Sequence, residues 1–210
     1  MLFIPYPIAM PVLNPLKLCY VSVETSPGTV QSESIVVAGS AFTPNALVDL
    51  SLDGDVVVSG AVTTNEGVLP RGLVASPEIR SGQRVFRLEA VERDNPDVSI
   101  GLESFTAALR VRVTPQRAAP ARRVRFRGRG FTGSGAVYAH YLRAGKLRRT
   151  VRLAKVASGA CGTFDVRRPQ FPFEPSNGTW RVQIDQHRRL SDEGPLVYLT
   201  IDVRRRARTR

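Results

Sequence analysis

Residues 39–54 read GSAFTPNALVDLSLDG, and this stretch decides the fold of the chain. The first residues suit a loop. Val48, Leu50 and Leu52 then alternate with polar side chains, which places one apolar face on an extended strand. Asp53-Gly54 is a strong signal for a tight hairpin turn. The stretch therefore predicts a half-buried strand that leads directly into a β-hairpin.

The same pattern returns 89 residues further along the chain. Gly39-Ser40-Ala41-Phe42-Thr43 corresponds to Gly128-Arg129-Gly130-Phe131-Thr132, and an alternating run follows each copy. Both copies also end in a segment with an apolar residue at every second position: Leu109, Val111 and Val113 in the first, and Leu199, Ile201 and Val203 in the second. We therefore expect two similar modules of about 90 residues, each large enough for its own core. Phe42 and Phe131 are expected to close the end of each core.

Strand signals recur along the whole chain, whereas helical periodicity is weak. Strands are expected at residues 18–24, 35–38, 48–52, 56–58, 60–64, 72–75, 85–91, 105–113, 124–127, 137–143, 147–153, 162–166, 180–185 and 197–203. Many short strands separated by turn signals are typical of a sandwich of two sheets. The predicted fold is all-β, with two tandem immunoglobulin-like β-sandwich domains and an extended N-terminal arm.

The domain boundaries follow from composition. We expect residues 1–16 to form a proline-rich apolar arm, 17–115 the first domain, 116–121 a linker, 122–204 a basic second domain, and 205–210 a basic tail. The linker contains Pro120 and directly follows Pro115. Four prolines exclude a continuous helix in the arm, and it is too short to span a bilayer. It also lacks the basic start of a cleavable export signal. Arms of this kind can dock on a neighbouring subunit, and a disordered start is the alternative.

Positive charge is concentrated in the second half of the chain. Residues 17–115 hold 8 Lys and Arg against 12 Asp and Glu, whereas residues 116–210 hold 22 against 6. Such a field favours an acidic partner, but solubility alone can also explain it. Cys19 and Cys161 fall one in each predicted domain, which favours isolated buried thiols over a bridge.

The residues that could support catalysis are few. The chain has two histidines, and His140 is expected to point outward because it alternates with the inward-facing Val137, Ala139 and Tyr141. Asp49, Asp53 and Asp55 lie on a strand and its turn and lack the other ligands of a calcium loop. Trp180 is the only tryptophan and is assigned to the core. We predict no enzyme, no cofactor and no metal site.

Two groups of residues are candidates for contact with a partner. Basic side chains around one hairpin and in the tail are candidates for binding a polyanion: Arg143, Lys146, Arg148, Arg149, Arg152, Arg205, Arg206, Arg208 and Arg210. Five residues of the arm are candidates for assembly: Phe3, Ile4, Pro5, Tyr6 and Pro7.

The motifs of both copies resemble a known group. Gly39 to Gly54, together with residues 128–132 and 159–164, is similar to the immunoglobulin-like repeats of actinobacterial surface proteins and tailed-phage virion proteins. This resemblance implies non-catalytic work such as adhesion, spacing or reinforcement of an assembly.

Three functions therefore stay open. The first is a virion component, as a capsid decoration or tail accessory protein, assembled in the host cytoplasm on other structural subunits. The second is an extracellular or cell-surface module that binds an anionic glycopolymer. The third, nucleic-acid binding, has charge in its favour but no motif. A homo-oligomer is compatible with each of them, and no membrane span is expected.

Overall fold

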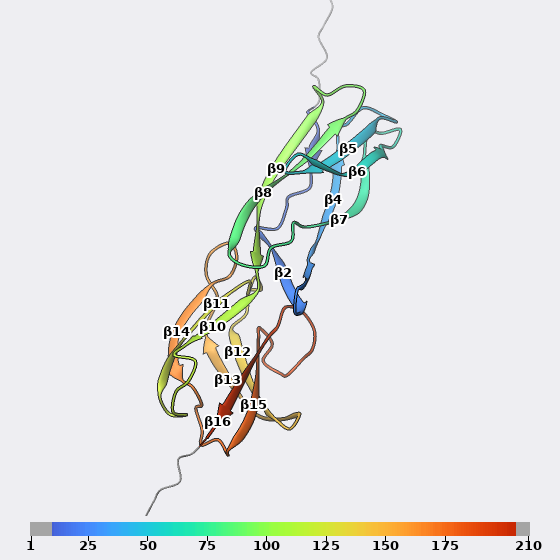
Figure 1. Ribbon diagram of the computed structural model, residues 1–210. Helices are drawn as coiled ribbons and strands as arrows, with labels where there is room; N and C mark the ends of the chain where they lie inside the picture. The colour runs from blue at the N-terminus through green and yellow to red at the C-terminus, as the bar shows by residue number, and fades with distance from the viewer. Residues whose placement is uncertain (1–9, 205–210) are drawn as a thin grey trace, which may run out of the picture. The chain divides into compact units, whose positions relative to one another are not determined.

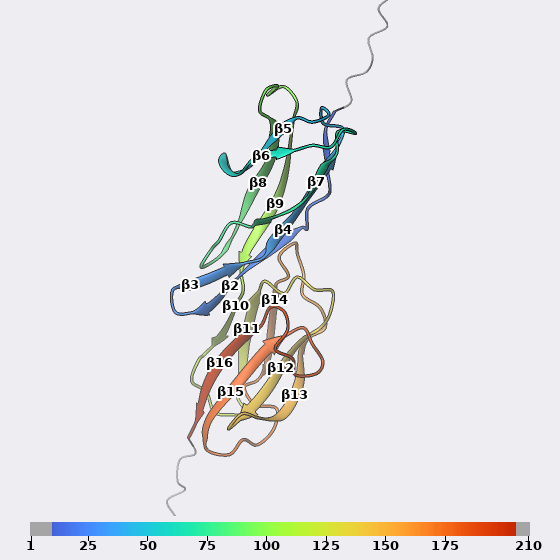
Figure 2. The same ribbon diagram turned by 90° about the vertical axis from the view of Figure 1, so that its right-hand side faces the viewer.

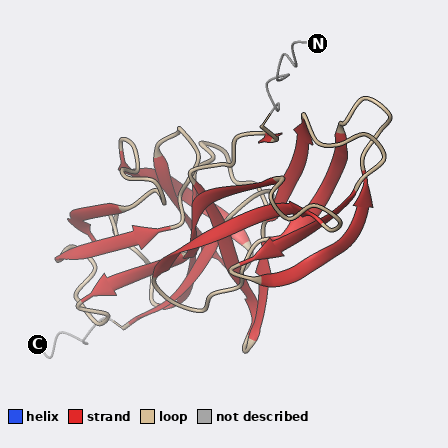
Figure 3. Ribbon diagram, turned by 90° about the horizontal axis from the view of Figure 1, so that it is seen from above, coloured by secondary structure: helices blue, strands red, loops and turns tan. Residues whose placement is uncertain are grey.

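A computed structural model describes residues 10–204 and shows an all-β protein. Figure 3 draws this part of the chain as strands and loops, without helices. Within it, no helix has the length and apolar character needed to cross a membrane. The expected arm residues Phe3 to Pro7 and the tail residues Arg205 to Arg210 lie outside the described range.

The chain divides into two compact units. Unit 1 comprises residues 1–20, 32–78 and 84–106, and unit 2 comprises residues 21–31, 79–83 and 107–210. Residues 107–115 were expected to end the first domain, but the structure assigns them to unit 2. The difference arises at the single expected strand 105–113, which is two strands, β9 (Ser99–Ala108) and β10 (Arg110–Thr114).

Unit 1 is built on a three-stranded sheet and a larger sheet. The first has the order β1 (Val12–Leu13), β4 (Ser34–Ser40), β7 (Leu69–Ala75). The second has the order β3 (Thr29–Ser32), β2 (Cys19–Ser26), β9, β8 (Gln83–Glu92), β5 (Leu47–Leu52), β6 (Asp55–Val62). Residues 21–26 of β2 and 29–31 of β3 belong to unit 2. The expected apolar face of β5 is buried, as are Phe86, Leu88 and Ala90 of β8, and both sets pack with Ile35 and Phe42 in one apolar core. Asp53 and Gly54 both have positive φ, which confirms the predicted hairpin between β5 and β6.

Unit 2 is a sandwich of three strands on four. One sheet has the order β10, β11 (Arg123–Arg129), β14 (Phe164–Pro169), and the other β13 (Lys146–Ala154), β12 (Val137–Arg143), β15 (Gly178–Asp185), β16 (Val197–Val203). The strand labels in Figure 1 locate both sheets, and in Figure 2 the four-stranded sheet lies in front of the three-stranded one. Every neighbouring strand pair within these two sheets is antiparallel. The chain is therefore an immunoglobulin-like β-sandwich protein.

Aromatic side chains fill one part of the core of unit 2. Trp180 is buried, as predicted, and its ring centroid lies 5.5 Å from those of Phe171 and Phe173. Its indole nitrogen donates a hydrogen bond to the carbonyl oxygen of Ser176 over 3.0 Å. Tyr141 completes the cluster, and its hydroxyl donates to the carbonyl oxygen of Gln170 over 2.9 Å. Each buried polar group of these rings is thus paired, as close packing requires.

The duplicated motif has the same local structure in both units. The backbone nitrogen of Phe42 donates to the carbonyl oxygen of Gly67, and that of Phe131 donates to the carbonyl oxygen of Gly162, each over 3.1 Å. Both phenylalanines are buried, as expected for residues that close a core. Both partner glycines have positive φ. The sequence repeat at residues 39–43 and 128–132 is therefore also a repeat of local backbone structure.

The expectation of isolated thiols is wrong. The chain has two cysteines, and both Cys19 and Cys161 are disulfide-bonded. Spacing along the sequence could not reveal this, because a disulfide depends on the distance between α-carbons in the folded chain.

Candidate anion-binding surfaces

The predicted basic hairpin is formed by β12 and β13 and turns at Ala144-Gly145, which both have positive φ. Lys146, Arg148, Arg149 and Arg152 are exposed on β13. Arg149 pairs with Tyr141, whose side chain lies in the core, whereas Arg152 pairs with Tyr138 on the opposite face of the sheet. Because side chains alternate along a strand, the structure does not bring all the predicted basic residues onto one face.

Arg143 is half-buried and already has partners. Its Nη2 donates to the carbonyl oxygen of Asn177 over 2.6 Å, and its guanidinium carbon lies 5.9 Å from the ring centroid of Trp180. These contacts place it at the edge of the aromatic cluster rather than free on the surface. Its guanidinium is therefore less available to a partner than those of the exposed residues of β13.

A second basic surface, which we call the arginine face, lies on the outer side of the β10-β11-β14 sheet. Direct antiparallel pairs place Arg110 opposite Arg129, Arg112 opposite Arg127, and Arg125 opposite Arg167. The residues between them, such as Val111 and Phe126, point into the core. The face therefore gathers one acidic and seven basic side chains: Asp165 with Arg110, Arg112, Arg123, Arg125, Arg127, Arg129 and Arg167.

Asp165 pairs with two arginines of this face. Arg125 forms a bidentate pair with it, with Nε 2.7 Å from Oδ1 and Nη2 2.6 Å from Oδ2, and the Nε of Arg127 lies 3.1 Å from Oδ2. The hydrogen bonds from Arg125 and then Arg127 outweigh the effect of desolvation and lower the pKa of the Asp165 carboxyl below its ordinary value. Within residues 10–204, Asp165 is the only carboxylate in an ion pair with any arginine of the face.

Sequence reasoning missed this surface, although one part of its signal was visible. Residues 123–129 alternate arginine with apolar or small residues, and Arg110 and Arg112 continue the pattern on another strand. The alternation indicates an arginine-lined strand. That β10, β11 and β14 are neighbours depends on pairing between distant segments, which the alternation does not specify.

His140 does not point into solvent as expected. Its side chain is fully buried on the outer side of the four-stranded sheet, beneath the segment between β15 and β16. Its Nδ1 lies 2.9 Å from the Thr150 hydroxyl, and its Nε2 lies 3.1 Å from the carbonyl oxygen of His187 and 3.3 Å from Oδ1 of Asp185. The expectation is wrong because alternation identifies the face of a sheet, while a loop decides whether that face is covered.

Asp185 is the centre of this buried polar cluster. It accepts hydrogen bonds from the Gln183 amide over 2.8 Å and from the His187 backbone nitrogen over 2.7 Å. Burial acts to raise the pKa of Asp185, but these hydrogen bonds and the one with His140 prevail and hold it below its ordinary value. His140 and Asp185 have fully buried side chains. The cluster therefore holds the segment after β15 in place.

A polar pocket of about 520 Å³ lies beside this cluster. It is lined by Leu142, Thr179, Arg181, Gln183, Asp192 and Tyr198 among others. The guanidinium carbon of Arg181 lies 3.5 Å from the centroid of the Tyr198 ring, and the Tyr198 hydroxyl donates to Asp192 over 3.4 Å. The charged and aromatic groups of the pocket thus contact one another.

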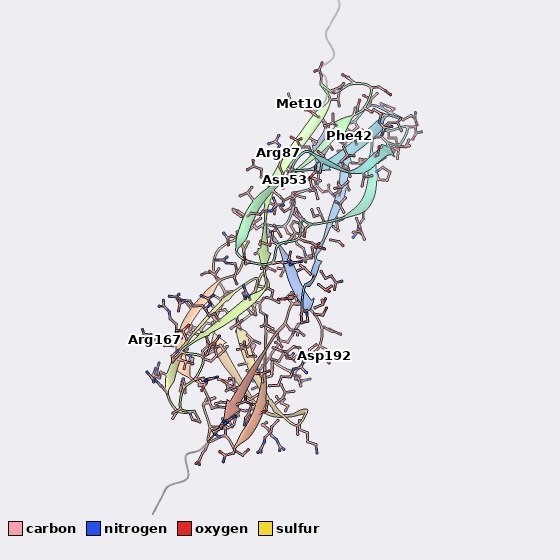
Figure 4. All side chains as sticks on the ribbon, in the orientation of Figure 1. Met10, Phe42, Asp53, Arg87, Arg167 and Asp192 are labelled. Atoms are coloured by element: carbon pink, nitrogen blue, oxygen red, sulfur yellow. The ribbon has the colours of Figure 1, made fainter. Side chains whose placement is uncertain are left out.

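Two of the three carboxylates of unit 1 that were compared with a calcium loop, Asp49 and Asp53, are paired with arginines and with backbone nitrogens. Asp49 accepts hydrogen bonds from Arg93 over 2.6 Å and from the backbone nitrogen of Gly60 over 2.7 Å. Asp53 accepts one from the backbone nitrogen of Arg87 over 2.9 Å, and Figure 4 shows these two residues close together in unit 1. Within the described range, no group of three or more potential ligands is arranged to hold a metal ion.

Comparison with known proteins identifies no relative by sequence: no family model and no curated protein matches the chain. Several solved structures share a distant likeness. The fibronectin(III)-like modules of CbhA from Clostridium thermocellum are 11% identical, with a TM-score of 0.30, and the alignment covers 92% of this chain and 94% of that chain. A glucan-utilisation protein of Bacteroides ovatus, SGBP-B, solved with a mixed-linkage heptasaccharide, is 13% identical, with a TM-score of 0.26 and 93% of this chain covered.

The extracellular cadherin domains 1–4 of protocadherin gamma B7 are 13% identical, with a TM-score of 0.27 and 92% of this chain covered. The alignments cover 48% of the SGBP-B chain and 49% of the protocadherin chain, so this chain matches about half the length of each. With such low TM-scores the likenesses are weak, and our description of the fold depends on strand pairing alone.

Proposed function

We propose that this protein is a non-catalytic interaction module whose second unit attaches it to an anionic polymer on a surface. The observation that carries the proposal is the segregation of charge: unit 2 has 25 Lys and Arg against 7 Asp and Glu, and unit 1 has 5 against 11. Exposed arginines on sheet faces supply long-range attraction to a polyanion and charge-assisted hydrogen bonds on contact.

The arrangement of polar groups supports a binding role over catalysis. The one histidine that sits in a hydrogen-bonded chain with a hydroxyl and a carboxylate, His140, is fully buried. A general base must reach the proton that it removes, and this imidazole cannot meet a substrate without unfolding of the segment above it. The exposed charged side chains of unit 2 in the described range are mainly arginines, which bind anions and do not titrate near neutral pH.

Binding of the full chain to immobilised polymers tests the proposal. We expect retention on immobilised polygalacturonate at 50 mM salt, none on neutral dextran, and release as the salt concentration rises, because ionic strength screens exposed charges. Retention that is unchanged between low and high salt, or no retention on any anionic polymer, would contradict the proposal.

A second proposal concerns the setting. The similarity of residues 39–54 to repeats of tailed-phage virion proteins supports a role as a capsid decoration or tail accessory protein, with structural subunits or a host polymer as partners. The chain would then be present in stoichiometric amounts in purified particles. Mass spectrometry of such particles tests this, and its absence from them would leave the cell-surface setting in place.

A further inference from the structure

We propose that the arginine face is the contact surface of unit 2 and that its ligand is a linear polysaccharide with carboxylate groups. This inference rests on the proposed function, because it specifies the site and the ligand chemistry of the attachment proposed above. The predicted hairpin on β13 would then contribute general attraction, and the arginine face would make the specific contacts.

The first argument is the regular placement of the arginines. Arg123, Arg125, Arg127 and Arg129 occupy every second position of β11 and point to one side. Such positions are about 7 Å apart along a strand, and neighbouring strands are about 4.8 Å apart. Arg110 and Arg112 on one neighbour and Arg167 on the other extend this row into a two-dimensional array. An extended chain with an acid group on each repeating unit can lie along the array and meet several guanidiniums in succession.

The second argument is that the face already binds a carboxylate. Arg125 and Arg127 hold the carboxylate of Asp165 with both of its oxygens engaged. This pair shows that guanidiniums on this face are placed to bind a carboxylate in the bidentate geometry that arginine prefers. Arg110, Arg112 and Arg167 are exposed and have no such acid partner within the described part of the chain. Figure 4 places Arg167 on the outer side of unit 2, where blue nitrogen tips gather.

The third argument distinguishes a glycan from a nucleic acid. Single-stranded nucleic acids bind most proteins through aromatic rings that stack on the bases, next to basic groups that contact phosphates. The outward positions of β10, β11 and β14 hold arginines, Thr114, Asp165 and Pro169, and no aromatic ring. The aromatic rings of these strands, Phe126 and Phe164, are buried in the core. The face offers guanidiniums without a stacking surface, which favours a polymer that carries charge but no bases.

Two triple variants of the full chain, matched in the charge that they remove, test the inference. The face variant is Arg110→Gln/Arg112→Gln/Arg167→Gln, and the control is Arg148→Gln/Arg149→Gln/Arg152→Gln on the hairpin. Each removes three exposed arginines, and emission of Trp180 reports whether unit 2 is folded. Affinity for polygalacturonate is measured against salt concentration, with dextran sulfate and single-stranded DNA as parallel probes.

We expect the face variant to lose at least about tenfold in affinity for polygalacturonate at low salt, since one lost charged hydrogen bond already has this effect. Its salt slope should also fall by about one for each arginine removed. The control should keep most of the affinity. Asp165→Asn should bind more tightly than the wild type, because it frees Arg125 and Arg127, and a misfolded variant could not mimic this gain.

Equal losses in both triple variants, or a larger loss in the hairpin variant, would overturn the assignment of the face and leave the proposed function standing. Tighter binding of DNA or dextran sulfate than of polygalacturonate through the face would overturn the choice of ligand. A wild-type chain that binds none of the anionic polymers would instead remove the proposed function itself.

Discussion

At the scale of single residues, two glycines give the duplicated motif the same close backbone contact in both units. A Cβ on Gly67 would lie 2.1 Å from the carbonyl oxygen of Phe42, and one on Gly162 would lie 1.9 Å from that of Phe131. Both glycines also have positive φ, which other residues adopt at a cost. The phenylalanines are recognisable from the repeat itself, whereas these glycine partners are not, because they lie 25 and 31 residues further along the chain.

Substitution of such a glycine should be far more damaging than substitution of a turn glycine. We expect Gly162→Ala to lower the free energy of unfolding of unit 2 by about 3 kcal/mol or more, because backbone must move away from the new methyl group. Gly145→Ala is the matched control: its φ is also positive, but nothing lies within 4 Å of the added Cβ. It should cost only about 1 kcal/mol. Urea unfolding followed by Trp180 emission measures both, and equal losses would show that the close approach is unimportant.

The buried cluster around Asp185 should make stability depend on pH in one direction. The folded-state pKa of Asp185 lies below its ordinary value of 3.8. Its contribution is therefore fully present above that value and is lost as the pH falls through the lower folded-state pKa. Asp185→Asn should lower the free energy of unfolding by about 3 kcal/mol at pH 7, because the substitution removes a buried, hydrogen-bonded charge from the cluster.

The difference between wild type and Asp185→Asn should then shrink below about pH 4. Denaturant unfolding of both proteins from pH 7 to pH 3 measures it. A difference that stays constant over this range would show that Asp185 is not the titrating group.

At the scale of elements, β10 decides which residues share a core. Its apolar residues Val111 and Val113 pack with Phe126 and Trp180 in the core of unit 2, where Leu109 also lies. The expected single strand 105–113 is wrong because the chain leaves one sheet at Ala108 and joins another at Arg110 without a glycine or proline to mark the break. The alternation of β10 suits either sheet equally well, so only its pairing with β11 settles the assignment.

A charge placed in β10 should therefore destabilise unit 2. We expect Val111→Asp to lower its free energy of unfolding by about 3 kcal/mol or more, since the carboxylate would be buried without a partner. Arg112→Ala is the control, because that side chain is exposed on the other face of the same strand. Amide hydrogen exchange of β11 and β14 measures the effect. Unchanged protection of these strands in Val111→Asp would contradict the placement of β10 in this sheet.

At the scale of the whole molecule, net charge and redox state are the properties that bear on the proposed function. The two units carry net charges of opposite sign, and in the described part of unit 2 eleven Lys and Arg side chains are exposed on strands. Both cysteines are oxidised in disulfide linkage. Disulfides persist in oxidising compartments and are rare in reducing ones, which agrees with the proposed surface setting.

The redox state gives a direct prediction. Protein purified without reductant and unfolded in guanidinium should show no reaction with a thiol reagent, and two thiols per chain should appear after reduction. Titration with a chromogenic disulfide reagent measures both states. Two reactive thiols before reduction would contradict the disulfide and weaken the argument for an oxidising compartment.

The sequence by itself determined the fold class, the buried faces of most strands and the tight turn at Asp53-Gly54, because alternation and turn chemistry are local properties of a few neighbouring residues. It also placed Trp180 and both motif phenylalanines in the core. The tertiary structure alone decided that His140 is covered, that β10 belongs to unit 2, that both cysteines are disulfide-bonded, and that seven arginines share one face. Each of these depends on which distant segments become neighbours. The free energy that favours one set of neighbours comes from contacts throughout the core, so no single stretch of sequence specifies it.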